Sequence, residues 1–246
     1  MKSYNVGDGA AQAKEVDPVP TDTAADAPPP ATLTREIVLR AALAIIDIDG
    51  ADRLTMRRLG QSLGRDPMAL YRYAANKNAL LDGVVELVMG QVRLDPTDID
   101  WAAQLRTYAR AFRDIAIAHP HVVPLLVTRP LATPLALRPL GTLRPLEDTL
   151  ELLTRAGFTD QEALHVYRSF QGFLYGHVLN ELQELVDNPE ETDDLLRLGL
   201  HRLPISEFPR LRGLASALAA YDGAAELEEG LDILIDGLRS KGPIPA

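Results

Sequence analysis

From Thr34 onward, apolar residues recur every three or four positions in segment after segment, a spacing typical of amphipathic helices. Helices are predicted over 34–50, 55–63, 66–73, 76–94, 99–118, 135–156, 160–187, 206–220 and 224–240. The stretch 119–134 contains four prolines, so it is expected to hold short helical turns at most. No alternating strand pattern of useful length occurs, and the sequence therefore predicts an all-α fold.

Two segments do not follow the helical pattern. Residues 1–33 are rich in Ala, Asp and Pro and end in Pro28-Pro29-Pro30, so we expect a disordered tail. This tail contains two lysines and five acidic residues. Its net negative charge favours a solvated leader over an accessory arm that contacts DNA. The segment 187–204, first acidic and then basic, is expected to be a mobile loop or a short helix.

The distribution of charge singles out one region of an acidic chain. The net charge is −10, yet residues 53–77 contain six basic side chains against Asp66 alone. These basic residues are Arg53, Arg57, Arg58, Arg65, Arg72 and Lys77. A basic patch on an acidic protein can contact phosphates while the acidic remainder orients its approach to DNA.

Composition excludes several other classes of protein. The chain has no cysteine, so disulfides, thiolate catalysis and cysteine zinc sites are excluded. No apolar run approaches the roughly 20 residues that span a bilayer, and no signal-peptide pattern occurs, so we expect a cytoplasmic protein without a membrane partner. A nucleophile elbow, an HExxH motif and a phosphate-binding loop are also missing, which argues against an enzyme.

Two short predicted helices joined at Gly64 form the pattern of a helix-turn-helix. Glycine permits the left-handed backbone that such a turn needs. In the second of these helices Leu70 is expected to be buried, whereas Met68 and Arg72 point outward. Arg72 could donate two hydrogen bonds to a guanine, and Met68 could contact a thymine methyl group.

The same residues resemble the N-terminal domain of TetR-family repressors. The resemblance is carried by Leu54-Thr55, Arg57, Leu59, Leu63-Gly64, Leu70-Tyr71, Tyr73, Asn76-Lys77 and Leu80-Leu81, without a gap. It implies that residues 34–80 form a DNA-binding domain whose third helix enters the major groove. It also implies phosphate contacts from Thr55, Arg57, Tyr71, Tyr73 and Lys77, and base contacts from Pro67, Met68, Ala69 and Arg72. Arg58 is either a further DNA contact or a solvated surface residue.

Residues 81–246 resemble the effector-binding and dimerisation domain of the tetracycline-repressor subgroup. The matching residues are Trp101, Tyr108 to Arg113, Thr128-Arg129-Pro130, Ala156-Gly157-Phe158 and Gly176 to Leu179. Three positions depart from that subgroup: Leu125 replaces a histidine that holds magnesium–tetracycline, Asn180 replaces a glutamate, and Arg93 replaces a histidine. Leucine cannot ligate a hard cation, so we expect no metal, no cofactor and a less polar small-molecule effector.

By matching position, the resemblance predicts which side chains line the effector cavity. They are Arg93, Tyr108, Phe112, Leu125, Thr128, Arg129, Leu164, Tyr167 and Gln171. Alternatives stay open, because Phe112, Leu125 and Leu164 could be ordinary core and Arg129 could form a structural ion pair. His119 and His121 have the spacing of a two-ligand metal clip, but no neighbouring carboxylate in the sequence completes it.

Together these features predict a ligand-responsive, sequence-specific DNA-binding regulator, a repressor released from its operator by an effector. Apolar residues on 160–187 and 224–240 predict a homodimer through a four-helix bundle. They include Phe170, Phe173, Leu174, Val178, Leu182 and Leu185, and Leu227, Leu231, Leu234, Ile235 and Leu238. An interaction protein that keeps the helix-turn-helix only for packing is the remaining alternative.

Overall fold

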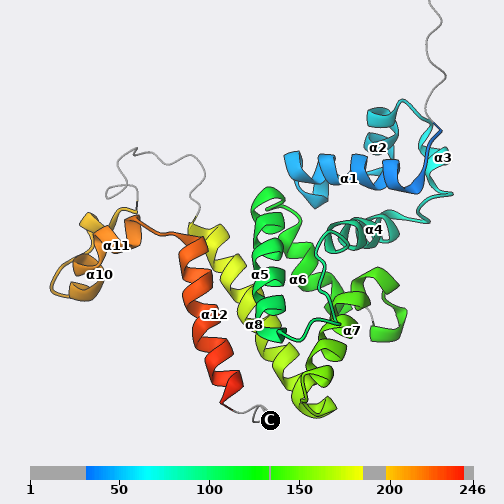
Figure 1. Ribbon diagram of the computed structural model, residues 1–246. Helices are drawn as coiled ribbons and strands as arrows, with labels where there is room; N and C mark the ends of the chain where they lie inside the picture. The colour runs from blue at the N-terminus through cyan, green and yellow to red at the C-terminus, as the bar shows by residue number, and fades with distance from the viewer. Residues whose placement is uncertain (1–31, 133, 185–197, 241–246) are drawn as a thin grey trace, which may run out of the picture. The chain divides into compact units, whose positions relative to one another are not determined.

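The computed structural model describes residues 32–132, 134–184 and 198–240, and this part of the chain is helical without a strand, which confirms the all-α prediction (Figure 1). The α-helices are α1 (Arg35–Asp49), α2 (Met56–Leu63), α3 (Pro67–Leu70), α4 (Lys77–Met89), α5 (Trp101–Ala118), α6 (Val123–Ala132), α7 (Leu140–Arg155), α8 (Asp160–Glu184), α10 (Pro209–Gly213), α11 (Ala215–Ala219) and α12 (Gly223–Arg239). Three short 3-10 turns are η1 (Ala51–Arg53), η2 (Leu135–Leu137) and η3 (Leu200–Arg202).

Two sequence predictions about helices are wrong. Residues 123–132 form a ten-residue helix instead of short turns, because Pro124 falls in the first turn, where a missing N–H is tolerated. The single helix predicted over 206–220 is two short ones, since Pro209 can only begin α10 and the chain leaves that helix after Gly213. Most of the predicted tail, Leu185 and most of the predicted loop lie outside the described residues.

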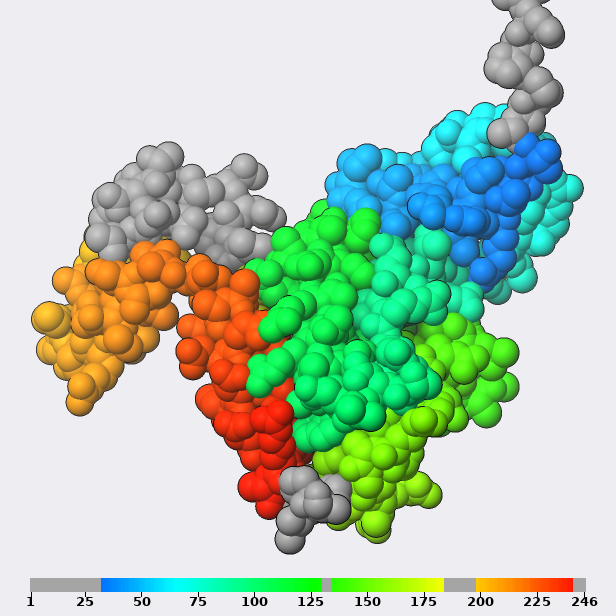
Figure 2. Space-filling view, viewed as in Figure 1, coloured from blue at the N-terminus to red at the C-terminus, as the bar shows by residue number. Residues whose placement is uncertain are grey.

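The first helices pack around a small core of their own. α1 contacts α2, η1 and α4, and Leu54, Leu59 and Leu70 are fully buried. α4 in turn packs against α6 and α7. In Figure 2 the blue-to-teal surface of the first helices runs without a break into the green surface.

The remaining helices build a larger core. α8 packs against α5, α7 and α12, and α5 also packs against α12. Most of the apolar residues predicted for the dimer bundle are used here: Phe170, Leu174 and Val178 of α8, and four leucine or isoleucine residues of α12, are buried inside the subunit. Their burial leaves a different face of α8 and α12 for a partner.

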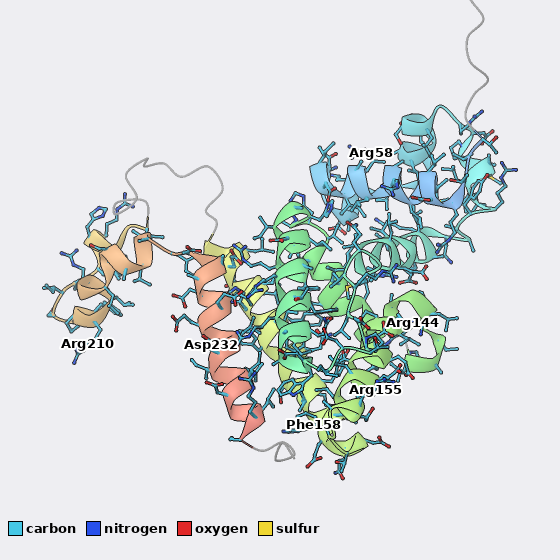
Figure 3. All side chains as sticks on the ribbon, viewed as in Figure 1. Arg58, Arg144, Arg155, Phe158, Arg210 and Asp232 are labelled. Atoms are coloured by element: carbon cyan, nitrogen blue, oxygen red, sulfur yellow. The ribbon has the colours of Figure 1, made fainter. Side chains whose placement is uncertain are left out.

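A buried ion pair joins α5 to α8 within this core. Arg113 donates from Nε to Glu181 Oε2 at 2.9 Å, and the Glu181 side chain is only 5% exposed. Gly223 at the start of α12 lies against the same carboxylate and has no room for a Cβ atom. On the surface Arg106 reaches Asp232 of α12 at 2.6 Å (Figure 3), so α5 is held to α12 by charge as well as by packing.

No helix in the ranges that the structure describes is long and apolar enough to cross a membrane.

Substitution of Gly60 is expected to destabilise the crossing of α2 and α3. A Cβ atom at Gly60 would lie 2.8 Å from the carbonyl oxygen of Arg65 and 3.1 Å from Pro67. Separating two packed backbones costs about 1–3 kcal/mol, more than the ~1 kcal/mol that alanine gains over glycine in a helix. Gly60→Ala should therefore lower the free energy of unfolding, measured by urea denaturation at fixed protein concentration. Gly213→Ala, which meets nothing within 4 Å, is the matched control and should not lower it.

Candidate functional site

Side-chain caps fix the α2–turn–α3 unit. Thr55 Oγ1 accepts a hydrogen bond from the Arg58 N–H at 3.1 Å, and Asp66 Oδ1 accepts one from the Met68 N–H at 2.8 Å. Gly64 between them has φ +61°, in the left-handed region that glycine adopts without strain. The local sequence therefore dictates both where α2 and α3 begin and how the chain turns between them.

The outward surface of α3 and the turn after it carries large side chains that the core does not use. Met68 is 73% exposed and Tyr71 is 45% exposed, and Arg72 is exposed beside them. Pro67 and Ala69 are half-buried at the same helix, and Thr55 and Arg57 are exposed at the start of α2. This surface combines cations, a methyl-bearing side chain and a phenol, which are the groups that contact phosphates and base edges.

Three residues predicted to contact DNA already have protein partners. Arg58 forms an ion pair with Asp49 at the end of α1 (Figure 3). The Tyr73 hydroxyl donates to the Leu33 carbonyl at 2.6 Å, and Lys77 Nζ donates to the Asp52 carbonyl at 3.2 Å. These contacts brace the small domain, so a phosphate contact from any of them requires an exchange of partners.

In the larger core, aromatic side chains of α5 and α8 gather around one another. The Tyr108 ring centre lies 6.5 Å from that of Phe112 and 5.9 Å from that of Phe170. Phe112 lies 5.4 Å from Tyr175, and Gln171 donates from Nε2 to the Tyr167 hydroxyl at 3.4 Å. We call Tyr108, Phe112, Tyr167, Gln171 and Tyr175 the tyrosine cluster.

Polar atoms in the tyrosine cluster are buried without partners. The Tyr108 hydroxyl and Gln171 Oε1 are shielded from solvent and lack a hydrogen-bond partner of good geometry, although the Gln171 side chain lies close to the Tyr108 hydroxyl. Burial raises the pKa of Tyr108 far above its ordinary value, so the phenol keeps its proton and can donate. Burial also raises the pKa values of Tyr167 and Tyr175. Buried polar groups of this kind call for a bound partner such as a ligand or a water.

A narrow cleft opens beside Tyr108, between the end of α4 and the first turns of α7. Arg93 and Arg144 line it with Asp148, whose pKa burial raises (Figure 3). Its volume is about 10 Å³, enough for one water molecule. The cleft in this structure is thus too small for a ligand larger than a water molecule.

Other residues predicted to line the effector cavity lie away from the tyrosine cluster. Leu164 lines a separate groove of about 470 Å³ with Phe158 and Leu238 (Figure 3). The Thr128 hydroxyl donates back to the Pro124 carbonyl at 2.7 Å, and Leu125 packs half-buried against the core.

Arg129 forms the structural ion pair that the sequence left open. Its Nε donates to Asp82 Oδ1 of α4 at 2.8 Å, and its Nη2 donates to the Asn78 carbonyl at 3.1 Å. Arg129 therefore fastens α6 to α4.

Tyr175 was missed by the sequence interpretation, although a signal for it exists. It follows Tyr167 and Gln171 at four-residue intervals, which places all three on one face of α8. A stripe of polar aromatic and amide side chains inside an otherwise apolar helix face indicates a cavity wall.

The histidine pair has a carboxylate neighbour that the sequence did not reveal. His119 Nδ1 lies 2.9 Å from Asp47 Oδ2, and His121 Nδ1 lies 2.9 Å from the Asp47 carbonyl oxygen. Asp47 belongs to α1, 72 residues before His119, so sequence spacing could not place it there. Even so, no group of three or more ligating side chains that could hold a metal occurs among the described residues.

Comparison with known proteins gives one consistent result. The family model of the tetracyclin repressor-like C-terminal domain matches residues 95–241. The class A tetracycline repressor from transposon 1721 of Escherichia coli is 31% identical over 211 residues, covering 83% of this chain and 89% of that protein. The transcriptional repressor DrrR1 of Streptomyces coeruleorubidus is 31% identical over 63% of this chain and 56% of that protein.

Solved structures agree with the sequence relatives. ActR of Streptomyces coelicolor in complex with actinorhodin superposes with a TM-score of 0.68 at 28% identity, covering 88% of this chain and 100% of ActR. Proteins of this family bind operator DNA as homodimers, respond to small molecules and are not enzymes. The chain belongs to the TetR family of ligand-responsive, DNA-binding transcriptional regulators.

Proposed function

We propose that this protein represses transcription from an operator read by α2 and α3, and leaves it when a flat aromatic effector binds at the tyrosine cluster. Residues 34–80 are the DNA-binding domain in this proposal, and residues 81–246 bind the effector and the second subunit. Because the protein acts on DNA, we place it in the cytoplasm.

The DNA-reading part is supported by exposure and charge. Met68, Tyr71 and Arg72 project from α3 and the following turn without a role in the core. They stand in the basic region of an acidic chain. Arg72 lies with its guanidinium carbon 4.9 Å from the Tyr73 ring centre, an arrangement that orients the side chain before DNA arrives.

The observation that carries the effector proposal is the unpartnered pair of polar atoms in the tyrosine cluster. The Tyr108 hydroxyl offers a donor and Gln171 Oε1 an acceptor, and aromatic rings flank both. An aromatic compound with a carbonyl and a hydroxyl group at its edge would satisfy both atoms while stacking on the rings. Arg93 at the adjoining cleft favours an acidic substituent, whereas Arg144 there already lies 4.0 Å from Asp148.

Magnesium–tetracycline is not the ligand in this proposal. Leu125 offers no donor atom to a metal, and Asn180 is an exposed amide on α8. ActR, solved in complex with actinorhodin, is a family member with a different ligand.

The homodimer is proposed to form through the faces of α8 and α12 that the subunit core does not cover. Ile233 is 77% exposed, and a side chain at Gly172, Gly176 or Gly237 would meet nothing within 4 Å. Small residues of this kind let helices of two subunits approach closely, as a four-helix bundle requires.

Selection of operator DNA from a random pool, followed by a release assay, tests the proposal. Phenols, hydroxyquinones and aromatic carboxylic acids are expected to release the selected site at micromolar concentration. Aliphatic acids of equal charge, and tetracycline with magnesium, are the negative controls. Release by aliphatic acids, or by no aromatic compound in a broad panel, would contradict the proposed effector class.

Tyr108→Phe removes the buried hydroxyl and keeps the ring. Operator affinity without a ligand should be unchanged, whereas the concentration of an aromatic effector needed for half release should rise about 3- to 10-fold, the value of one hydrogen bond. Tyr221→Phe makes the same chemical change at an exposed position and should leave that concentration as in the wild type. Equal effects of the two substitutions would rule out a ligand contact by Tyr108.

Arg72→Ala is expected to weaken binding to the selected operator by ~1–3 kcal/mol if Arg72 reads a guanine. Binding to random DNA should change much less, because a base contact contributes only at its own base pair. Fluorescence anisotropy with both DNAs measures the difference, and an equal loss on both would show a phosphate contact instead.

A further inference from the structure

Glu86 in α4 contacts two other helices at once. Its Oε2 accepts a hydrogen bond from Arg35 Nη2 at the start of α1, at 3.0 Å. Its Oε1 accepts one from the backbone N–H of Gly141, in the first turn of α7, at 3.3 Å. One carboxylate therefore links the helix that carries the DNA-binding unit to a helix of the effector-binding region.

Both of these contacts depend on glycine. A Cβ atom at Gly141 would lie 2.6 Å from Glu86 Cγ, so with any side chain there α7 and the Glu86 side chain must move apart. Gly83, one turn before Glu86, allows α1 to lie close to α4, because a Cβ atom there would lie 2.6 Å from Leu39 Cδ2. The backbone of α4 is thus held close to α1, and its carboxylate close to α7.

The electrostatic setting suits a residue that fixes position. The carboxylate lies at the N-terminal turn of α7, where unpaired N–H groups and the helix dipole favour negative charge. The Arg35 and Glu86 side chains are 53% and 28% exposed, so the ion pair is screened and adds little to global stability. We expect the ion pair to affect the orientation of α1 relative to α7.

The same turn of α7 forms a wall of the cleft beside Tyr108. Gly141, Arg144 and Pro145 all line that cleft, which holds only one water molecule. A molecule that widens the cleft must move this turn, and the hydrogen bond from Gly141 to Glu86 must then change. The hydrogen bond from Arg35 to the other oxygen of the carboxylate then changes as a consequence.

We propose that Glu86 is a positioning residue that sets the orientation of α1, and with it the α2–α3 unit, relative to α7. In a homodimer this orientation determines how far apart the two DNA-binding units stand along the duplex. Loss of the Glu86 contacts makes the dimer more tolerant of the distance between operator half-sites. The inference rests on the DNA-binding function of the family and is independent of the effector class proposed above.

The test compares two DNAs with the intact full-length dimer and needs no effector. One is the selected operator, and the other has one base pair added between its half-sites. Wild-type protein should discriminate between them, and Glu86→Gln should reduce the ratio of the two dissociation constants by about threefold or more. Because both DNAs meet the same protein sample, a partly unfolded fraction cancels from the ratio.

Three further variants complete the design. Glu36→Gln breaks the exposed Arg40–Glu36 pair of 2.7 Å on α1 without touching α7, and should keep the wild-type ratio. Gly141→Ala forces α7 and the Glu86 side chain apart, and should lower the ratio as Glu86→Gln does. The double variant Glu86→Gln/Gly141→Ala should lower it no further, because both changes act on the same link between α1 and α7 through the side chain at position 86.

Two outcomes would overturn the assignment. In the first, Glu86→Gln has the same ratio as the wild type and Glu36→Gln. In the second, the effects of Glu86→Gln and Gly141→Ala add fully in the double variant, which would mean that they act through separate contacts.

Discussion

The close contact between α1 and α4 is the constraint on which the rest of the structure depends. Gly83 allows Leu39 to lie directly on the α4 backbone, and the apolar faces of both helices complete the contact. From this position α4 reaches α6 through Asp82 and Arg129, and α7 through Glu86 and Gly141. A change of orientation between the DNA-binding unit and the effector-binding helices therefore involves these polar contacts of α4, together with the contacts of His119 and His121 with Asp47 of α1.

Charge pairing explains how an acidic chain can present a basic surface. Arg106 and Arg110 of α5 pair with acidic residues of α12, and Arg113 pairs with Glu181 inside the core. These arginines hold helices together and contribute little positive field to the surroundings. At α2 and α3, by contrast, Arg57 and Arg72 are exposed where phosphates can approach.

Rules that use only neighbouring residues predicted the helix ends and turns that those neighbours determine. Capping residues and the glycine turn placed α1, α2 and the start of α3, and four-residue spacing placed α8 and α12. Proline misled the prediction at 123–132, because its effect depends on its position within a helix.

Contacts between distant segments could not be predicted from spacing. The partners of Arg129 and His119 lie 47 and 72 residues away, and only packing brings them together. The candidate cavity shows the same limit. Of the side chains that a match of positions predicted for the cavity, Tyr108, Phe112, Tyr167 and Gln171 lie together. The separate surroundings of Leu164 and Thr128 follow from how α6 and α8 pack.

The small volume beside Tyr108 has a consequence for how fast a ligand arrives. A cleft of about 10 Å³ cannot admit an aromatic ring, so an effector that bound there as proposed would require the protein to open first. If opening precedes binding, the observed association rate stops rising at high ligand concentration and equals the opening rate. The apparent affinity is then lower than the intrinsic affinity by the fraction of open molecules. For such an effector, the narrow cleft would make the regulator ignore brief or weak exposure and respond to sustained concentrations.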